Sequence, residues 1–431
     1  MRRDTRKDMK EPEKSLAQAK QHLPKWRATM NLATKTMPWM VASLLTATPF
    51  FGQNQSGGNC PQPCKPVKCC TTQVPQQPTT CAYNAPAEIN VGCQGDVDVF
   101  LSGSFIYWQP ILDNGNVALV NDNTRAQFTN AAPFKFAGNF VEMNFQYKPG
   151  FKVGAGVNLQ TDDWDGYAEY TRVHGSHNVA SNGGYIGTSP PNVYPTWGSP
   201  FLVSQGSQVY NRVAATFDNN LDFIDAEMGR KYYVGRNLVF RSAFGARGAW
   251  IIQSMVVDYT NSQSAVSASA SGNSFQQSVP GVFHVVSESH SWGIGPRMGL
   301  TMDWNLGEGF RFIGSGYTDI LYTKYVLQDK SRFTATITNS PFTADQPVDF
   351  LAKDTVKAVR AHLDLEMGLG WGTYFDNNNW HFDLLATYGY QVFFQQNMFH
   401  HYNDDQMLGN STAPNGDLTV NGLTVTARFD F

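Results

Sequence analysis

The stretch LTVTARFDF, residues 423–431, ends the chain and decides the expected fold. Apolar and polar side chains alternate along it, which is the pattern of a β-strand with one face in an apolar environment. Its last residue is a phenylalanine, whereas the ends of soluble chains are normally polar and frayed. An ordinary edge strand is the alternative, but only a closed barrel leaves no strand edge free in a membrane. We therefore predict an all-β, transmembrane, up-and-down antiparallel barrel, with a signal for the barrel-assembly machinery at Leu423, Val425, Ala427, Phe429 and Phe431.

The composition agrees with a barrel that is apolar outside and polar inside. Only 16% of the residues are charged, against roughly 25% in typical proteins. Aromatic residues reach 13%, and glycine occurs 38 times. The mean hydropathy of -0.34 excludes a helical membrane protein. The net charge of -3 gives no basic footprint for nucleic acid, so no nucleic-acid partner is expected.

The first 52 residues read as a basic N-terminal extension followed by a signal peptide. An apolar stretch at 37–51 is short for a membrane span and has the length of a signal-peptide core. Translation from Met30 would give a conventional signal, so the true start is either Met30 or Met1 with a long basic region. An uncleaved amphipathic helix is the alternative reading.

Residues 53–94 form a segment rich in cysteine, proline and glutamine, which is expected to lie in the periplasm. Such a composition cannot build a core and is typical of a tether. Cysteines of an exported chain most simply form disulfides. Internal pairing and crosslinks to other envelope proteins both remain open, and a zinc site is disfavoured because no CxxC motif occurs. The disulfide candidates are Cys60, Cys64, Cys69, Cys70, Cys81 and Cys93.

Residues 95–431 carry a two-residue period in runs long enough to cross a bilayer, which takes about 9–11 residues. Short turns alternate with long polar loops, as in outer-membrane barrels with periplasmic turns and extracellular loops. The loops are expected at 109–138, 175–219, 258–284, 326–354 and 398–417. Ten strands are expected, or twelve if 175–219 hides a hairpin at Gln208–Phe217. They are 97–108, 139–160 (bent at Pro149-Gly150), 164–174, 220–233, 237–257, 285–304, 309–325, 355–375, 379–397 and 419–431.

The polar faces of these strands predict the inside of the barrel. Charged rings select ions by sign, and an acidic excess here, which includes Asp225 and Glu227, predicts a weak preference for cations. The alternative is that these charges pair with one another and brace the wall of a narrow barrel. The predicted pore-lining residues are Lys152, Asp165, Glu169, Arg241, Arg247, Arg297, Asp303, Arg311, Asp319, Asp364, Glu366 and Asp383.

Several stretches resemble the Legionella-type major outer membrane protein family, which also occurs in Chlamydia-related bacteria. The more specific of them are the Trp164-Asp165 pair and the WGIGPR and WGTYFDN motifs, and others are SGSFIYWQP and FRSAFGARGAWI. The resemblance covers about 95–431 and implies a pore-forming outer-membrane barrel. It supplies no motif of functional residues. Crosslinking of chlamydial envelopes by disulfides keeps the crosslinking option open for the cysteine segment.

The expected function is a porin for passive diffusion of small hydrophilic solutes or ions across the outer membrane. The alternative is a non-conducting structural or surface-interaction barrel, adhesin-like or crosslinked to the envelope. A lumen hydrolase using His381 and Asp383 is disfavoured, because neither GxSxG nor HExxH occurs. We expect no enzyme activity, catalytic residue, metal or cofactor. The expected partners are outer-membrane lipid, the assembly machinery and disulfide-linked envelope proteins.

Overall fold

The computed structural model describes most of the chain from Val97 onward. The described residues are 97–121, 138–159, 163–183, 193–197, 210–261, 265–267, 276–278, 281–335, 348–376, 379–402, 411–412 and 415–431. The expected signal peptide, the alternative start at Met30 and the six cysteines lie outside them. None of the described residues belongs to a helix long and apolar enough to span a membrane.

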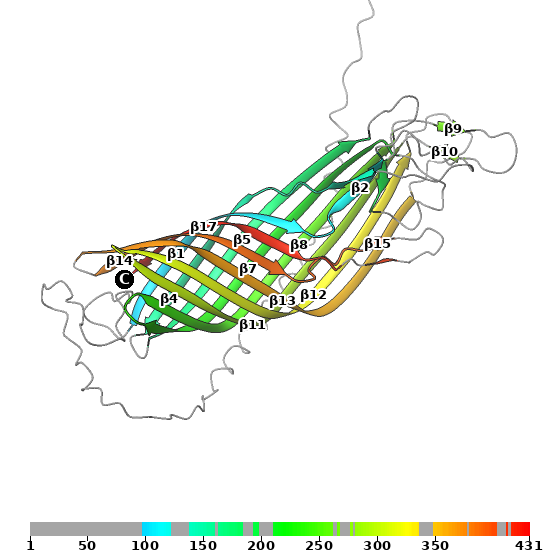
Figure 1. Ribbon diagram of the computed structural model, residues 1–431. Coiled ribbons are helices and arrows are strands. Elements are labelled where there is room, and N and C mark those ends of the chain that lie inside the picture. The colour runs from blue at the N-terminus through cyan, green and yellow to red at the C-terminus, as the bar shows by residue number, and fades with distance from the viewer. Residues whose placement is uncertain are drawn as a thin grey trace, which may run out of the picture. The chain divides into compact units, whose positions relative to one another are not determined.

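Ten antiparallel strands form a closed barrel (Figure 1). Around the barrel the order is β1-β17-β14-β13-β12-β11-β8-β7-β5-β4, so each strand pairs with its neighbours in the chain and the first also pairs with the last. The predicted fold class is therefore confirmed. The strands are β1 (Val97–Leu112), β4 (Lys148–Leu159), β5 (Trp164–Asn182), β7 (Arg212–Val234), β8 (Leu238–Asn261), β11 (Gly281–Gly307), β12 (Phe310–Ala335), β13 (Val348–Phe375), β14 (Trp380–Phe393) and β17 (Leu418–Asp430).

Short turns join the strands at one end of the barrel. Left-handed backbone there falls on Asp163, Gly235, Glu308, Gly309 and Asp376, whose φ angles lie between 52° and 81°. Glycine and aspartate adopt this conformation more readily than branched residues do. The turn composition thus explains why the chain reverses tightly at this end.

Two belts of aromatic side chains bound an apolar band on the outer surface. On β11 the exposed side chains Trp292 and Trp304 mark its two limits, with Ile294, Met298 and Leu300 exposed between them. Trp292 and Trp304 are twelve residues apart on β11, which corresponds to about 40 Å of strand. With the usual strand tilt this length spans roughly 30 Å across a bilayer. That span equals the thickness of a hydrocarbon core of about 30 Å.

Six strands continue well beyond the belt that lies away from the short turns. Figure 1 shows β7, β8, β11, β12 and β13 running past the shorter strands, and residues 174–182 of β5 pair with β7 in the same region. We call this extension, formed by the parts of β5, β7, β8, β11, β12 and β13 beyond the belt, the tall wall. The sequence prediction ended these strands early, because polar outward residues beyond the belt were read as loop. In fact the same strands alternate polar outer residues with a buried inner face there, as in the pattern of Arg212–Val234.

The expected strand 139–160 was wrong as a single element. Residues 143–147 are not strand, and they separate β4 from β3 (Gly138–Glu142). β3 joins β2 (Asn116–Asn121) and β6 (Val193–Pro195) in a small separate sheet. The twelve-strand alternative was wrong too, since residues 212–217 are the first part of β7. Two short pairs complete the described strands: β9 (Ala265–Ser267) with β10 (Gln276–Ser278), and β15 (His401–Tyr402) with β16 (Ser411–Thr412) outside the barrel.

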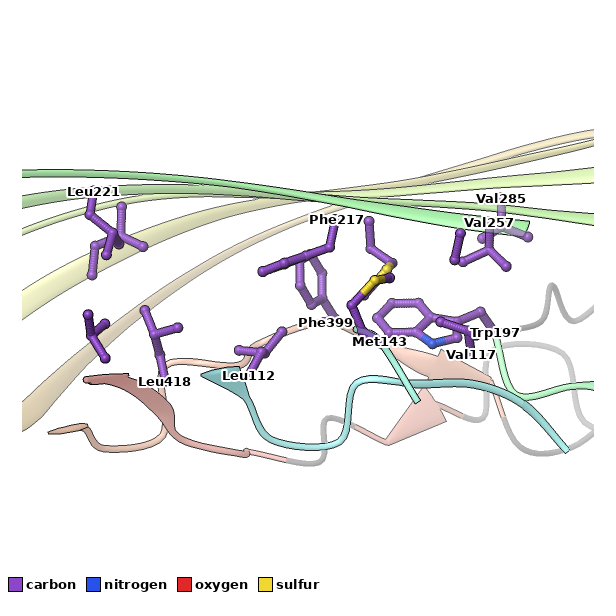
Figure 2. Close-up of a cluster of buried hydrophobic side chains, with 14 of the residues drawn as sticks. Leu112, Val117, Met143, Trp197, Phe217, Leu221, Val257, Val285, Phe399 and Leu418 are labelled. Atoms are coloured by element: carbon purple, nitrogen blue, oxygen red, sulfur yellow. The ribbon is translucent and has the colours of Figure 1, made fainter. Parts of the chain in front are cut away.

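A buried apolar cluster fills the space between the tall wall and the small sheet. Figure 2 shows Phe217, Leu221, Val257 and Val285 facing side chains from β1, β2, β17 and the connections after β3, β6 and β14. Tyr259 donates a hydrogen bond to the carbonyl oxygen of Val117 and so ties the two parts together. The barrel is therefore filled with apolar side chains on the side of the long connections. The facing residues are Leu112, Val117, Met143, Trp197, Phe399 and Leu418.

The pairing of β17 with β1 closes the barrel and depends on the last residues of the chain. The Phe431 amide donates to the Val99 carbonyl oxygen at 2.9 Å, and the Val99 amide donates back at 3.1 Å. The Phe431 ring points outward and lies 5.9 Å from the Trp380 ring. We predict that Phe431→Ala lowers the assembled, heat-modifiable fraction several-fold on gels, because it removes this aromatic contact. Phe394→Ala, which removes another exposed outward ring, is the control. Equal assembly of both variants would contradict the prediction.

Candidate functional site

The lumen contains a chamber of about 390 Å³ whose wall is strongly charged. Side chains from all ten barrel strands contribute to it, because inward positions alternate with lipid-facing ones along each strand. Ten of the twelve predicted pore-lining residues lie on the chamber wall, and Arg247 and Asp319 lie buried beside it. The ten are Lys152, Asp165, Glu169, Arg241, Arg297, Asp303, Arg311, Asp364, Glu366 and Asp383.

Arg241 anchors one group of charges on the chamber wall. Its Nε donates to both carboxylate oxygens of Asp165 at 3.0 and 2.8 Å. One terminal nitrogen donates to Glu227 Oε1 at 2.8 Å and to the Tyr317 hydroxyl at 3.3 Å. A guanidinium held by two carboxylates has little rotational freedom. This group therefore fixes the geometry of the wall across β5, β7, β8 and β12.

A second group surrounds Asp319 and is almost completely buried. Arg247 makes a bidentate contact with Asp225 at 2.6 and 2.7 Å. The Asp319 carboxylate accepts from Arg297 at 3.1 Å and contacts His362 Nδ1 at 2.8 Å, and Arg247 lies 3.4 Å away. Arg297 continues to Asp364 at 3.3 Å. Asp319 thus joins two arginines and a histidine in one network. The sequence analysis gave pairing of the lumen charges as its alternative, but it did not predict these partners.

Lys152 faces two carboxylates across the chamber. Its ammonium lies 3.4 Å from Glu169 Oε1 and 3.7 Å from Glu366 Oε1. It also lies 5.1 Å from the centre of the Trp108 ring, within the range of a cation–π contact. These residues come from β1, β4, β5 and β13, so the contact spans the seam between the first and last parts of the chain.

The last strand supplies a group that the sequence prediction missed. Arg428 donates to Asp430 Oδ1 at 2.5 Å and lies 3.6 Å from the centre of the Phe100 ring. His381 Nδ1 lies 3.2 Å from Asp430 Oδ2. Arg311 binds Asp383 nearby. Alternation in LTVTARFDF already places Arg428 and Asp430 opposite the lipid face, so the signal was present although neither residue was predicted to line the lumen.

Aromatic rings end the charged region on the side of the long connections. The Phe393 ring stacks on Phe223 with centroids 5.3 Å apart, and the His362 ring lies 4.0 Å from Phe393. The guanidinium of Arg247 lies 5.3 Å from the centre of the Phe223 ring. Leu321 is 3% exposed and belongs to the same apolar cluster. This aromatic layer packs directly against Arg247 and His362 of the buried network around Asp319.

A cavity of about 10 Å³, large enough for a single water, lies beside Phe393. Gln396 closes one side of it, donating to Ser291 Oγ at 3.0 Å and accepting from the Tyr325 hydroxyl at 3.0 Å. Arg360 also lines the cavity, and its guanidinium donates to the side chain of exposed Gln395 at 2.6 Å. Polar side chains therefore extend from the cavity to exposed Gln395, just beyond the end of β14.

The fold and this site define the class of the protein. A closed barrel with lipid-facing aromatic belts and a charged interior is an outer-membrane β-barrel. Residues 98–431 match the family model of the Legionella pneumophila major outer membrane protein precursor. The chain belongs to this family. No curated protein matches it significantly.

Solved structures similar to the chain are outer-membrane proteins of low sequence identity. The outer membrane protease OmpT from Escherichia coli is 9% identical, with 78% of this chain and 96% of that chain covered and a TM-score of 0.34. A Pseudomonas aeruginosa FadL homologue is 9% identical, with 79% and 91% covered and a TM-score of 0.23. The Pseudomonas putida toluene transporter TodX is 8% identical, with 78% and 90% covered and a TM-score of 0.18. Similarity this weak implies nothing about catalysis or transport by this chain.

Proposed function

We propose that this protein is a narrow porin that passes small hydrophilic solutes and ions across the outer membrane. The observation that carries the proposal is the charged chamber of about 390 Å³ inside the barrel. A lumen that only stabilised the wall would be filled by packed side chains, as in the smallest barrels. Family membership supports the proposal, since its namesake is a major outer membrane protein.

The proposed path leaves the chamber beside Phe393 and continues through the small cavity bounded by Gln396. It reaches the surface between Arg360 and Gln395, where β13 has no further pairing with β14. Phe393 and Gln396 close this path in the described conformation. Hydrophobic constrictions of this kind gate channels by excluding water. We therefore expect brief, small current steps from the wild-type protein in planar bilayers, with longer openings when the constriction is weakened.

The charge of the chamber wall predicts a weak cation preference. Six basic residues face eight acidic ones along the wall. The basic set is Lys152, Lys231, Arg241, Arg297, Arg311 and Arg428, and the acidic set is Asp165, Asp225, Asp303, Asp364, Asp383, Glu169, Glu227 and Glu366.

The double substitution Glu169→Gln/Glu366→Gln should abolish this preference. It removes two negative charges and leaves the Lys152 ammonium without its two carboxylate partners. The reversal potential in a KCl gradient measures the effect, and the permeability ratio of potassium to chloride should fall to about 1 or below, since rings of charge set the sign of selectivity. Lys152→Gln should move the ratio the opposite way. Glu288→Gln, on the outer surface above the belt, is the control. A wild-type reversal potential on the anion side would contradict the proposed preference.

The second candidate is a non-conducting structural or surface barrel. The paired charges of the lumen and the apolar cluster under the small sheet favour it, since both act to hold the interior closed. Disulfide links from the cysteine segment to other envelope proteins would then carry part of the function. Planar-bilayer recording of the full-length, heat-modifiable protein separates the two candidates. Absence of current from the wild type and from variants with a weakened constriction would leave the structural role.

A further inference from the structure

We propose that the outer face of β12 and β13 binds the phosphate groups of an anionic glycolipid in the outer leaflet. The surface consists of Lys324, Lys353 and Lys357, immediately beyond the aromatic belt on the side of the long connections. In outer-membrane barrels this side faces the exterior. The inference does not depend on whether the barrel conducts.

The register of the strands brings two of these lysines together. Lys324 lies directly opposite Lys357 in the β12–β13 ladder. On its other side Lys324 lies opposite Trp292, which belongs to the aromatic belt away from the short turns. Lys353 precedes Lys357 on the same face of β13, with exposed Thr355 between them. Like charges directly opposite each other destabilise a sheet. An anion between the two ammonium groups would turn this repulsion into attraction.

No carboxylate of the described residues forms an ion pair with Lys324, Lys353 or Lys357. The contrast is Lys330, farther along β12, whose ammonium lies 3.2 Å from Glu288 Oε2. Lys353 and Lys357 are exposed, and Lys324 is half-buried beside Trp292. Clusters of basic side chains next to the bilayer are a common means of binding anionic headgroups. The three lysines therefore form a cationic surface at headgroup level.

Below the lysines the same two strands offer an apolar surface. Ile320 and Tyr322 of β12 are 55% and 47% exposed, and Val359 and Met367 of β13 are 64% and 63% exposed. An acyl chain would lie along these side chains while the phosphates contact the lysines above. This combination of apolar and cationic contacts fits a phosphorylated lipid better than it fits a free anion or an acidic protein.

The simpler explanation is that these lysines only protect a strand edge. β13 pairs with β14 from His362 onward, so residues 348–361 form an edge of the tall wall, and edge lysines discourage unwanted strand pairing. That role would not require Lys324, which lies on β12 between two paired strands. It would also produce no dependence of stability on an anionic lipid. The two explanations therefore differ in a measurable way.

The test measures, by native mass spectrometry, how tightly diphosphoryl lipid A binds to the full-length protein folded in a non-ionic detergent. The substitution Lys324→Ala/Lys357→Ala should weaken binding by about thirty-fold, given the usual contribution of each basic residue at an anionic surface. Lys324→Arg/Lys357→Arg should keep most of the affinity. Arg172→Ala/Arg212→Ala, which removes two outward positive charges from β5 and β7, is the matched control and should leave the affinity within about twofold.

The change in thermal stability on adding lipid A is a second measurement. It should be absent if the lysines only protect a strand edge. Without lipid, Lys357→Ala should be as stable as the wild type or more so, since the like-charge pair is relieved. With lipid A, the wild type should gain more stability than the variant. Equal binding of lipid A by the wild type and the lysine double variant would overturn the proposal. Equal stabilisation by lipid A and by inorganic pyrophosphate would also overturn it, because the apolar surface would then play no part.

Discussion

Replacing Phe393 with alanine should lengthen channel openings and raise the current in planar-bilayer recordings. The Phe393 ring lies near Phe223 and His362, with centroids 5.3 and 4.0 Å away, and it lines the small cavity at Gln396 on the proposed path. A stacked aromatic pair is worth about 0.5–1.5 kcal/mol beyond its burial, which is up to about tenfold in a closed–open equilibrium. Loss of the ring also widens the constriction, so water should enter it more readily.

The matched control for this prediction is Phe399→Ala. Phe399 is a buried ring of the same apolar cluster, 5.5 Å from Trp197 and away from the proposed path. Both substitutions should lower stability by about 3–5 kcal/mol, as large-to-small changes in a core usually do. Only Phe393→Ala should change the current. If both variants conduct equally, general loosening of the interior is responsible; if neither conducts, the barrel is structural.

Alternation of side chains was sufficient to predict the barrel, its ten strands and the inward direction of the charged residues. It works because each strand has one face in lipid and one in a polar interior, so a residue's parity fixes its surroundings. Asp165 and Arg241 illustrate this: each was placed on the inner face from its own strand alone. Their contact at 2.5 Å could not be predicted from the sequence. The two residues are 76 positions apart in the chain, and whether they meet depends on the stagger between their strands.

The tall wall and the filled interior were not predictable in the same way. Beyond the belts the outer face becomes polar, as at His290 and Lys330, so the apolar period that marks a membrane strand disappears. The inner face there is buried by β2, β3 and β6. β2 and β6 come from connections expected to be loops, and β3 was expected to be the start of the strand 139–160. Residues such as Leu221 and Val257 therefore pack in a core that no single strand pattern reveals.

Asp319→Ala should be the most destabilising single change in the charged lumen. The Asp319 side chain is fully buried and contacts Arg247, Arg297 and His362 at 3.4, 3.1 and 2.8 Å. Removing one partner of a buried ion pair leaves uncompensated charge and typically costs about 3–5 kcal/mol. The midpoint of urea unfolding in lipid vesicles, followed by tryptophan fluorescence, should fall accordingly. In variants that still assemble, the reversal potential should move toward anions, because the network loses one negative charge while Arg247 keeps Asp225 and Arg297 keeps Asp364 as its carboxylate partner.

Asp303→Ala provides the comparison that separates burial from charge. Its side chain is 33% exposed and lies 3.7 Å from Arg311, so the pair is screened and its loss should cost less than about 1 kcal/mol. The shift in reversal potential should be similar for both variants, because each loses one negative charge. The fall in the midpoint of urea unfolding should occur only in Asp319→Ala. A small stability loss for Asp319→Ala would mean that water already reaches the network, and the charges would then line a hydrated path instead of bracing the wall.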